Sequence, residues 1–213
     1  MRAARWLIAI AVVAGICWLF PLFHVVPLKT ATAEKAAEKF DAATFAENFW
    51  AEKLLPAADK AVSADVLIAA IQKNSANAKT NYSRSVGLSD SYFYFLRGEG
   101  KIASISDDAV LIAVTGNSTN AEIALQTGLI FGDAIRDGTG LLNANDYPNS
   151  QDFNDISAAL NHIVETKILP KLHKQAKVGA KISFAGCAEV DDESSDLHPL
   201  KVVPVRVESQ AQP

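Results

Sequence analysis

The hydrophobic pattern of the chain begins with an unbroken apolar segment close to its first residue. Residues 6–28 contain no Asp, Glu, Lys or Arg, and Arg2 and Arg5 precede them. About 20 helical residues span the hydrocarbon core of a bilayer, so the segment is long enough to cross it. Because flanking positive charge stays in the cytoplasm, we expect a single-pass anchor at residues 1–28 in the inner (cytoplasmic) membrane, with the C-terminal domain in the periplasm.

Two other fates of this segment stay open. Ala31-Thr32-Ala33 has the small-x-small pattern of a signal-peptide cleavage site, although it lies far behind an apolar stretch longer than signal peptides have. Lipidation would use Cys17, but Ile16 stands where a lipoprotein has a small residue. These residues favour an uncleaved anchor. Residues 29–39, rich in Ala, Glu and Lys, follow it as a helical or flexible spacer.

The next part of the chain, residues 40–81, has the pattern of a small helical subdomain. Asp41 suits a helix N-cap, and a broad apolar face follows it until Pro56 is expected to stop the helix. Ser63 or Asp65 can cap a second helix with apolar residues on one face. The polar stretch at residues 72–81 is expected to end the helical part.

After residue 82 the pattern changes to short apolar runs separated by glycines. We expect strands at residues 92–96, 101–106, 109–115, 121–127, 180–187 and 202–207, with a tight hairpin turn at Gly98-Glu99-Gly100. A helix is expected at residues 155–172, with Ile156, Leu160, Ile163 and Val164 facing the core. The predicted fold class is therefore α+β. Residues 82–213 form an OB-like, partly closed barrel with an inserted helix.

Composition adds limits on the class of protein. Hydrophobic residues make up 49% of the 213 residues, and the net charge is −4. Mean hydropathy is +0.11, and the apolar segment accounts for its sign. The chain after residue 28 has 18 basic and 24 acidic residues, a net charge of −6. This balance excludes a disordered chain and a protein that binds nucleic acid through bulk positive charge.

The motifs that carry common chemistries are weak in this sequence. Gly98-Glu99-Gly100 lacks the third glycine and the following helix of a dinucleotide-binding loop. The acidic loop at residues 189–196, which precedes His198, could offer oxygen ligands to a hard cation. It lacks the spacing of an EF-hand, so a solvated loop is expected. Cys187 lies in a strand-like context in which a small buried residue is typical. We expect no catalytic residue, no metal site and no cofactor.

The most informative polar group follows two glycines that bracket three apolar residues, at residues 128–132. An adjacent Arg and Asp come next, and amide side chains follow. The arginine could bind a carboxylate through two hydrogen bonds, and the amides could donate hydrogen bonds to a polar solute and accept them from it. The same side chains could equally satisfy buried groups of the protein. The candidate binding residues are Arg136, Asp137, Asn149, Gln151 and Asn161.

At these residues the chain resembles a bacterial family of predicted periplasmic lipoproteins, the domain of unknown function 2291 family. The resemblance covers nearly the whole part after the apolar segment. It rests on Phe40-Asp41, Phe45, Trp50, Leu55-Pro56, Gly98-Glu99-Gly100, residues 128–132, Arg136-Asp137, Asn149, Phe153, Leu160-Asn161 and Val178-Gly179.

The resemblance implies a helical subdomain packed on an OB-like subdomain, and an accessory role beside sugar-type ABC transporter components. It supplies no catalytic residues. We therefore expect a membrane-anchored periplasmic accessory protein that acts through contact with a transporter component or a small polar solute. A direct small-solute (sugar) binding protein is the main alternative, and a hydrolase that uses Cys187 or His162 is the least supported.

Overall fold

The computed structural model of the chain describes residues 40–87, 89–115, 120–147 and 149–209. The anchor predicted at residues 1–28 and the spacer predicted at residues 29–39 therefore lie outside the described residues. None of the helices within the described ranges is both long enough and apolar enough to cross a membrane.

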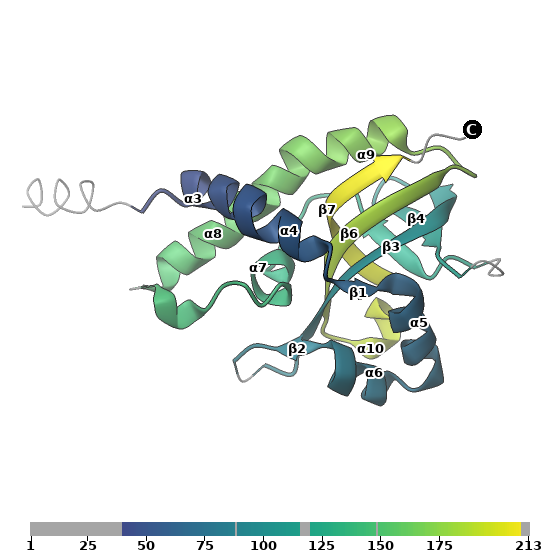
Figure 1. Cartoon of the computed structure of the whole chain (residues 1–213), viewed down its shortest axis with the longest axis horizontal. Helices are drawn as coiled ribbons and strands as arrows, with labels where there is room; N and C mark the ends of the chain where they lie inside the picture. The colour runs from purple at the N-terminus through teal and green to yellow at the C-terminus, as the bar shows by residue number, and fades with distance from the viewer. Residues whose placement is uncertain (1–39, 88, 116–119, 148, 210–213) are drawn as a thin grey trace, which may run out of the picture. The chain divides into compact units, whose positions relative to one another are not determined.

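Five strands form a closed barrel (Figure 1). Around the barrel the order is β3-β4-β5-β7-β6, and β6 pairs back to β3. Neighbouring strands are antiparallel except β5 and β7, which are parallel. This arrangement is that of an OB fold and confirms the α+β class and the OB-like barrel of the prediction. The strands are β3 (Tyr92–Ile105), β4 (Ala109–Ala113), β5 (Ile123–Gln126), β6 (Lys181–Val190) and β7 (Leu200–Ser209).

The prediction of a hairpin turn at Gly98-Glu99-Gly100 is wrong, and so is the prediction that the barrel is only partly closed. Residues 98–100 lie in the middle of β3, which pairs with β6 without interruption from Tyr92 to Lys101. A Cβ atom on Gly98 would lie 2.6 Å from the Cβ of Ala64, and one on Gly100 would lie 2.6 Å from the carbonyl oxygen of Ala113. The two glycines therefore permit close packing across a long strand, and that strand closes the barrel.

Two helical runs lie beside the barrel, and each contains a wide turn immediately before a Leu-Pro pair. Pro56 does not stop the first run, which continues to Ala58, so that prediction is wrong. A proline ring clashes with the carbonyl four residues earlier in an α-helix, and a π-helical turn widens the backbone at that point. The segments are α3 (Ala42–Phe49), η1 (Trp50–Leu54) and α4 (Leu55–Ala58), then α8 (Ser150–Ile163), η3 (Val164–Ile168) and α9 (Leu169–Gln175).

The second run provides much of the buried apolar surface. Ile156 and Leu160 of α8 and Val164 of η3 are fully buried, and Ile163 is 4% exposed, so the core face predicted for this helix is confirmed. η3 and α9 contact β7, and α3 lies along α8 (Figure 1). Burial of each large aliphatic side chain contributes about 2 kcal/mol, so this helix fixes one side of the barrel.

Short helices and strands link the two helical runs and the strands of the barrel. β1 pairs with β3 in parallel, and β2 pairs with it antiparallel. From Asp41 on, the chain clusters into one compact unit. The division into a helical subdomain at residues 40–81 and a β-rich subdomain at residues 82–213 remains a sequence prediction. The short elements are β1 (Val62–Ser63), α5 (Ala64–Lys73), α6 (Ser75–Tyr82), β2 (Arg84–Ser85), α7 (Ala134–Gly138), η2 (Ala144–Asp146) and α10 (Glu193–Asp196).

Candidate functional site

Arg136 of α7 is bound by other residues of the protein. Its Nε and Nη2 atoms donate to the two carboxylate oxygens of Asp137 over 2.8 and 2.9 Å. Nη2 also lies 3.0 Å from Oδ2 of Asp133, and Nη1 donates to Asn154 over 3.3 Å. The guanidinium lies 4.0 Å from the ring centre of Phe153. With side chains only 8% exposed, Arg136 and Asp137 form a buried ion pair.

The electrostatics of this pair follow from its burial. Burial alone would lower the pKa of Arg136, but the hydrogen bonds and charge of Asp137 outweigh it and raise the pKa, so the guanidinium stays charged. Glu189 of β6 is nearby, and burial, followed by the charge of Asp191 and that of Asp133, raises the pKa of its carboxyl. The surroundings of Arg136 are therefore rich in carboxylates.

The three amide side chains predicted with Arg136 also have partners within the protein. Asn149 is the N-cap of α8, where it accepts the N–H of Asp152 over 2.8 Å. Gln151 donates to Asp155 one turn later on the same helix, over 2.7 Å. Asn161 donates to the carbonyl of Gly132 over 3.0 Å. Each of the five candidates thus supports local structure, and their role in ligand binding stays a prediction.

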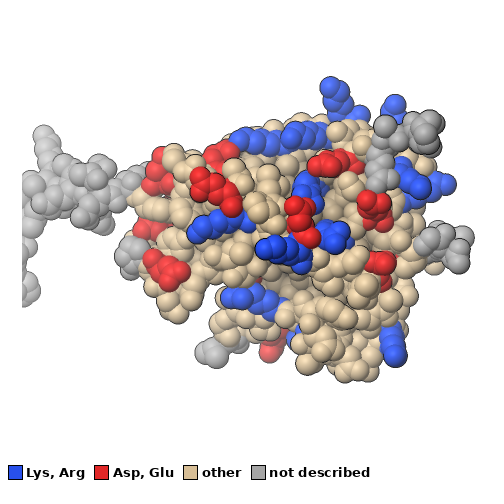
Figure 2. Space-filling model, viewed as in Figure 1, with Lys and Arg blue, Asp and Glu red and all other residues tan. Residues whose placement is uncertain are grey.

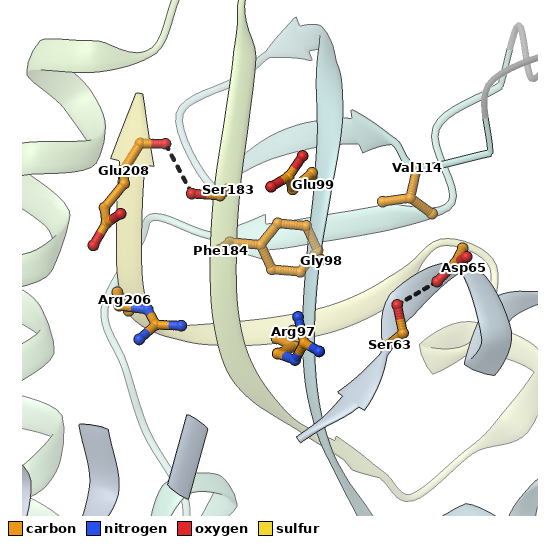
Figure 3. A pocket seen from close by; sticks show the side chains of 10 residues that line it. All are labelled: Ser63, Asp65, Arg97, Gly98, Glu99, Val114, Ser183, Phe184, Arg206 and Glu208. Atoms are coloured by element: carbon orange, nitrogen blue, oxygen red, sulfur yellow. Dashed lines mark hydrogen bonds between the residues drawn. The ribbon is translucent and has the colours of Figure 1, made fainter. Parts of the chain in front are cut away.

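A different group of polar side chains lines a pocket of about 440 Å³ on the barrel (Figure 3). Arg97 of β3 is opposite Ala185 of β6, which is opposite Arg206 of β7. Residues directly opposite one another point to the same side of a sheet. The two arginines therefore stand on one face, about two strand spacings or ~10 Å apart.

A second row of the same face carries the opposite charge. Glu99 is opposite Ser183, and Ser183 is opposite Glu208, two residues along each strand from the first row. Side chains two residues apart on a strand share a face, so a row of carboxylates lies beside the row of guanidiniums. Figure 3 shows Glu99 and Arg97 on either side of Gly98. The pocket thus offers both signs of charge and the hydroxyl of Ser183.

The two arginines differ in their partners. Arg206 donates to Asp59 over 2.8 Å, whereas the side chain of Arg97 makes no hydrogen bond or ion pair with any residue that the structure describes. Asp65, at the start of α5, lines the same pocket. The Ser63 hydroxyl, then the N–H of Val66 and more weakly the charge of Arg97, lower the pKa of Asp65. Arg97 therefore has all its donors available at the pocket.

Sequence reasoning missed this group for a specific reason. With residues 98–100 interpreted as a turn, Arg97 and Glu99 had no common face. A continuous strand places them on one side by simple alternation. The pairing of β3 with β6 and of β6 with β7 then adds Ser183, Arg206 and Glu208 from near the other end of the chain. A turn in place of a strand thus concealed the site.

The other candidate chemistries have less support in the structure. The side chain of Cys187 is fully buried, and burial raises the pKa of its thiol, which disfavours its use as a nucleophile. Among the described residues, no group of three or more His, Cys, Asp or Glu side chains is placed to hold a metal ion.

The sequence matches the family described as predicted periplasmic lipoprotein, the domain of unknown function 2291 family, over residues 7–208. The chain belongs to this family. The resemblance predicted from the sequence is therefore confirmed, and membership in this family supports a periplasmic, membrane-associated location. The family description gives no biochemical activity.

A solved structure supports the fold of this family member. The crystal structure of an OB-fold protein from Thermotoga maritima is similar to this structure, with a TM-score of 0.71, and the two sequences are 26% identical. The match covers 81% of this chain and 100% of the Thermotoga chain. No curated protein matches the sequence. The comparisons thus establish family and fold and leave the activity to be inferred from the site.

The acidic loop of this family member is a structural element. The carboxylate of Asp196 accepts the N–H groups of Asp191 and Asp192 over 3.1 and 3.0 Å, and Lys201 donates to it over 3.0 Å. Burial raises the pKa of Asp196, but these bonds outweigh it and hold the pKa at about 2. The loop predicted to be solvated is therefore closed by its own carboxylate.

Asp196→Asn should destabilise the protein at pH 7 by about 2 kcal/mol, because the lowered pKa reports how strongly folding favours the charged form. This contribution is complete above the unfolded pKa near 4 and disappears as the pH falls through about 2. Urea denaturation of both proteins from pH 7 to pH 2 measures the difference. A difference in stability that is constant over this range would contradict the prediction.

Proposed function

We propose that this protein is a periplasmic accessory protein of a sugar-type ABC transporter that binds a sugar-like solute carrying an anionic group. The solute occupies the pocket on β3, β6 and β7. The observation that carries the proposal is Arg97, which lines the pocket and whose guanidinium makes no ion pair or hydrogen bond among the described residues. A guanidinium binds a carboxylate or a phosphate through two parallel hydrogen bonds.

The rest of the pocket fits the remainder of such a solute. The carboxylates of Glu99 and Glu208 accept hydrogen bonds from hydroxyl groups, and the hydroxyl of Ser183, which donates to the carbonyl of Glu208 over 3.4 Å, can accept one. The volume of about 440 Å³ lies in the range of small-molecule sites. On the face in Figure 2, acidic and basic side chains are interleaved, so local groups rather than one broad field would select the ligand.

Binding fits the described residues better than catalysis. Hydrolysis by a thiol needs an accessible thiolate with a base beside it. Cys187 is buried with a raised pKa, and the pocket contains no histidine or cysteine. The association with a transporter rests on the family resemblance. An accessory protein of solute uptake would contact either the solute or a transport component, and the pocket provides a place for the solute.

The test uses the purified full-length protein in mild detergent, with D-glucuronate, D-glucose 6-phosphate and D-glucose as probes. The two acidic sugars should raise the melting temperature, because a ligand that binds the folded state stabilises it by about 3 kcal/mol at 100 times its Kd. D-Glucose should raise the melting temperature less. Arg97→Met should weaken binding of the acidic sugars at least tenfold, since it removes a charge-assisted bidentate contact.

Lys53→Met is the matched control, because Lys53 is an exposed cation outside the pocket. Failure of both acidic sugars to shift melting at 10 mM, or an equal shift in Arg97→Met, would exclude this solute class. Affinity purification of the full-length protein from the cell envelope separates the second half of the proposal. Recovery of no transport component would leave a solute-binding protein without the transporter.

A further inference from the structure

The loop after β5 displays two large apolar side chains to solvent. Leu129 and Phe131 are each 76% exposed, whereas Ile130 between them is only 4% exposed. Isolated exposed apolar residues are common in soluble proteins, but two bulky ones on either side of a buried anchor form a defined feature. This loop lies apart from the pocket of Arg97 and has a chemistry of its own.

The protein holds this loop in a fixed conformation through its helices. The N–H of Ile130 donates to Glu165 of η3 over 3.1 Å. The carbonyl of Gly132 accepts from Asn161 of α8 over 3.0 Å, and Gly132 has a φ of 82°, which disfavours other residues. The middle of the Leu129–Phe131 triplet and the residue after it are thus tied to the helical run. A fixed display lowers the entropy that binding would otherwise cost.

An apolar groove begins at the same loop. Its volume is about 430 Å³, and Leu129 lines it together with residues of β4, β5 and the start of β7. The apolar lining includes Ala109, Leu111, Ala124 and Pro199. Leu129 therefore belongs both to the displayed pair and to the wall of the groove. We call this surface, Leu129 and Phe131 with the groove, the apolar loop surface.

Carboxylates lie at both ends of the apolar loop surface. Asp108 lines the groove, and its Oδ1 lies 3.3 Å from the position of a Cβ atom on Gly128; exposed Asp107 precedes it. At the other end, Oε2 of Glu189 lies 3.1 Å from the corresponding position on Gly132. The lysine at the groove, Lys201, is already paired with Asp196.

We infer that the apolar loop surface binds a segment of a partner protein in which apolar side chains are flanked by Lys or Arg. The apolar side chains would cover Leu129 and Phe131 and enter the groove, and the cations would face Asp107, Asp108 and Glu189. Complementary charge of this kind selects partners and orients them. An anionic lipid surface has the wrong sign for these carboxylates, so the same residues favour a protein over a membrane.

The test measures peptide binding to the full-length protein in phosphatidylcholine nanodiscs. The probes are two synthetic peptides with the same Leu and Phe residues, one flanked by Lys and the other by Glu. The Lys-flanked peptide should bind at least tenfold more tightly. Leu129→Ser/Phe131→Ser and Asp107→Lys/Asp108→Lys should each weaken it at least tenfold, because truncating a central apolar contact or reversing the facing charge removes the complementarity.

Val178→Ser is the matched control, because Val178 is 66% exposed and lies in the turn before β6, away from the loop. It should leave binding unchanged, and all variants should keep the melting temperature of the unaltered protein, since they change exposed residues. Equal binding of the two peptides, no binding of the Lys-flanked peptide at 1 mM, or full binding by the Leu129/Phe131 variant would overturn the inference.

A membrane is tested as the opposing outcome. A fluorophore attached through Phe131→Cys reports contact with lipid when the nanodiscs contain nitroxide-labelled phosphatidylglycerol. The inference expects quenching no stronger than at Val178→Cys. Strong quenching at residue 131 alone would assign the surface to the bilayer and overturn the proposed protein partner.

Discussion

Arg136→Ala is expected to lower the free energy of unfolding by about 4 kcal/mol, measured by urea denaturation of the full-length protein. The substitution leaves the carboxylate of Asp137 buried without its cation, and removing one partner of a buried ion pair costs about 3–5 kcal/mol. It also removes the contact with Asp133 and the stacking on Phe153. The loss therefore combines electrostatics and packing.

The exposed pair of Lys167 and Glu47 provides the control. Their side chains are 52% and 50% exposed, and ion pairs of this kind contribute less than about 1 kcal/mol. Lys167→Ala should therefore change stability only slightly. If Arg136→Ala were equally mild, the buried pair would not hold α7 in place, and a ligand-binding role for Arg136 would regain support.

Gly100→Ala is the second substitution with a large expected effect, a loss of about 3 kcal/mol. The new methyl group would lie 2.6 Å from the carbonyl oxygen of Ala113 and would also collide with Ile112 on β4. Because one of these atoms belongs to the backbone of a paired strand, the barrel itself must shift, and overpacking of this kind costs about 1–3 kcal/mol or more. The melting temperature and urea denaturation report the loss.

Gly128→Ala separates this collision from the general cost of replacing a glycine. The nearest atom to its new methyl group is Oδ1 of Asp108 at 3.3 Å, the end of an exposed side chain that can move. Gly128→Ala should stay within about 1 kcal/mol of the unaltered protein. Equal losses at residues 100 and 128 would show that the close approach of β3 and β4 is not the cause.

The elements with a clear period could be predicted from the sequence. Strands β4 to β7 and the helical run from α8 to α9 follow their hydrophobic patterns, and the N-cap at Asp41 follows its residue type, with its carboxylate accepting the N–H of Thr44 over 3.1 Å. By contrast α6 has no apolar face and was expected to be the polar end of the helical part. Its start depends on Asn74, which accepts the N–H of Asn77 over 2.9 Å.

The errors occurred where one residue type serves two purposes. A glycine pair fits a turn and equally fits a strand that another backbone approaches, so Gly98 and Gly100 were interpreted as the commoner case. Pro56 ends an ordinary helix, but packing of α3 against α8 keeps the helix intact through a wide turn. Such choices depend on tertiary contacts, which a local pattern does not contain.

The candidate site depends even more on tertiary contacts, so it was harder to predict from the sequence. Arg136 and Asp137 are adjacent in the sequence and so formed a visible polar group, yet they bind each other. Arg97 and Arg206 are more than 100 residues apart, and only the pairing of three strands brings them to one pocket. A single sequence shows nearby polar groups and conceals those that a sheet assembles.

The pairing of β3 with β6 has a consequence for the order in which the chain folds. Tyr92 pairs with Val190 and Lys101 with Lys181, so the barrel cannot close until the last quarter of the chain has been made. At about 5–20 residues per second, synthesis of the intervening segment takes roughly 4–20 s, during which the side of β3 that pairs with β6 has unpaired backbone groups. Pairing over so long a loop is also slow. We therefore expect β3 to be the segment on which a chaperone acts.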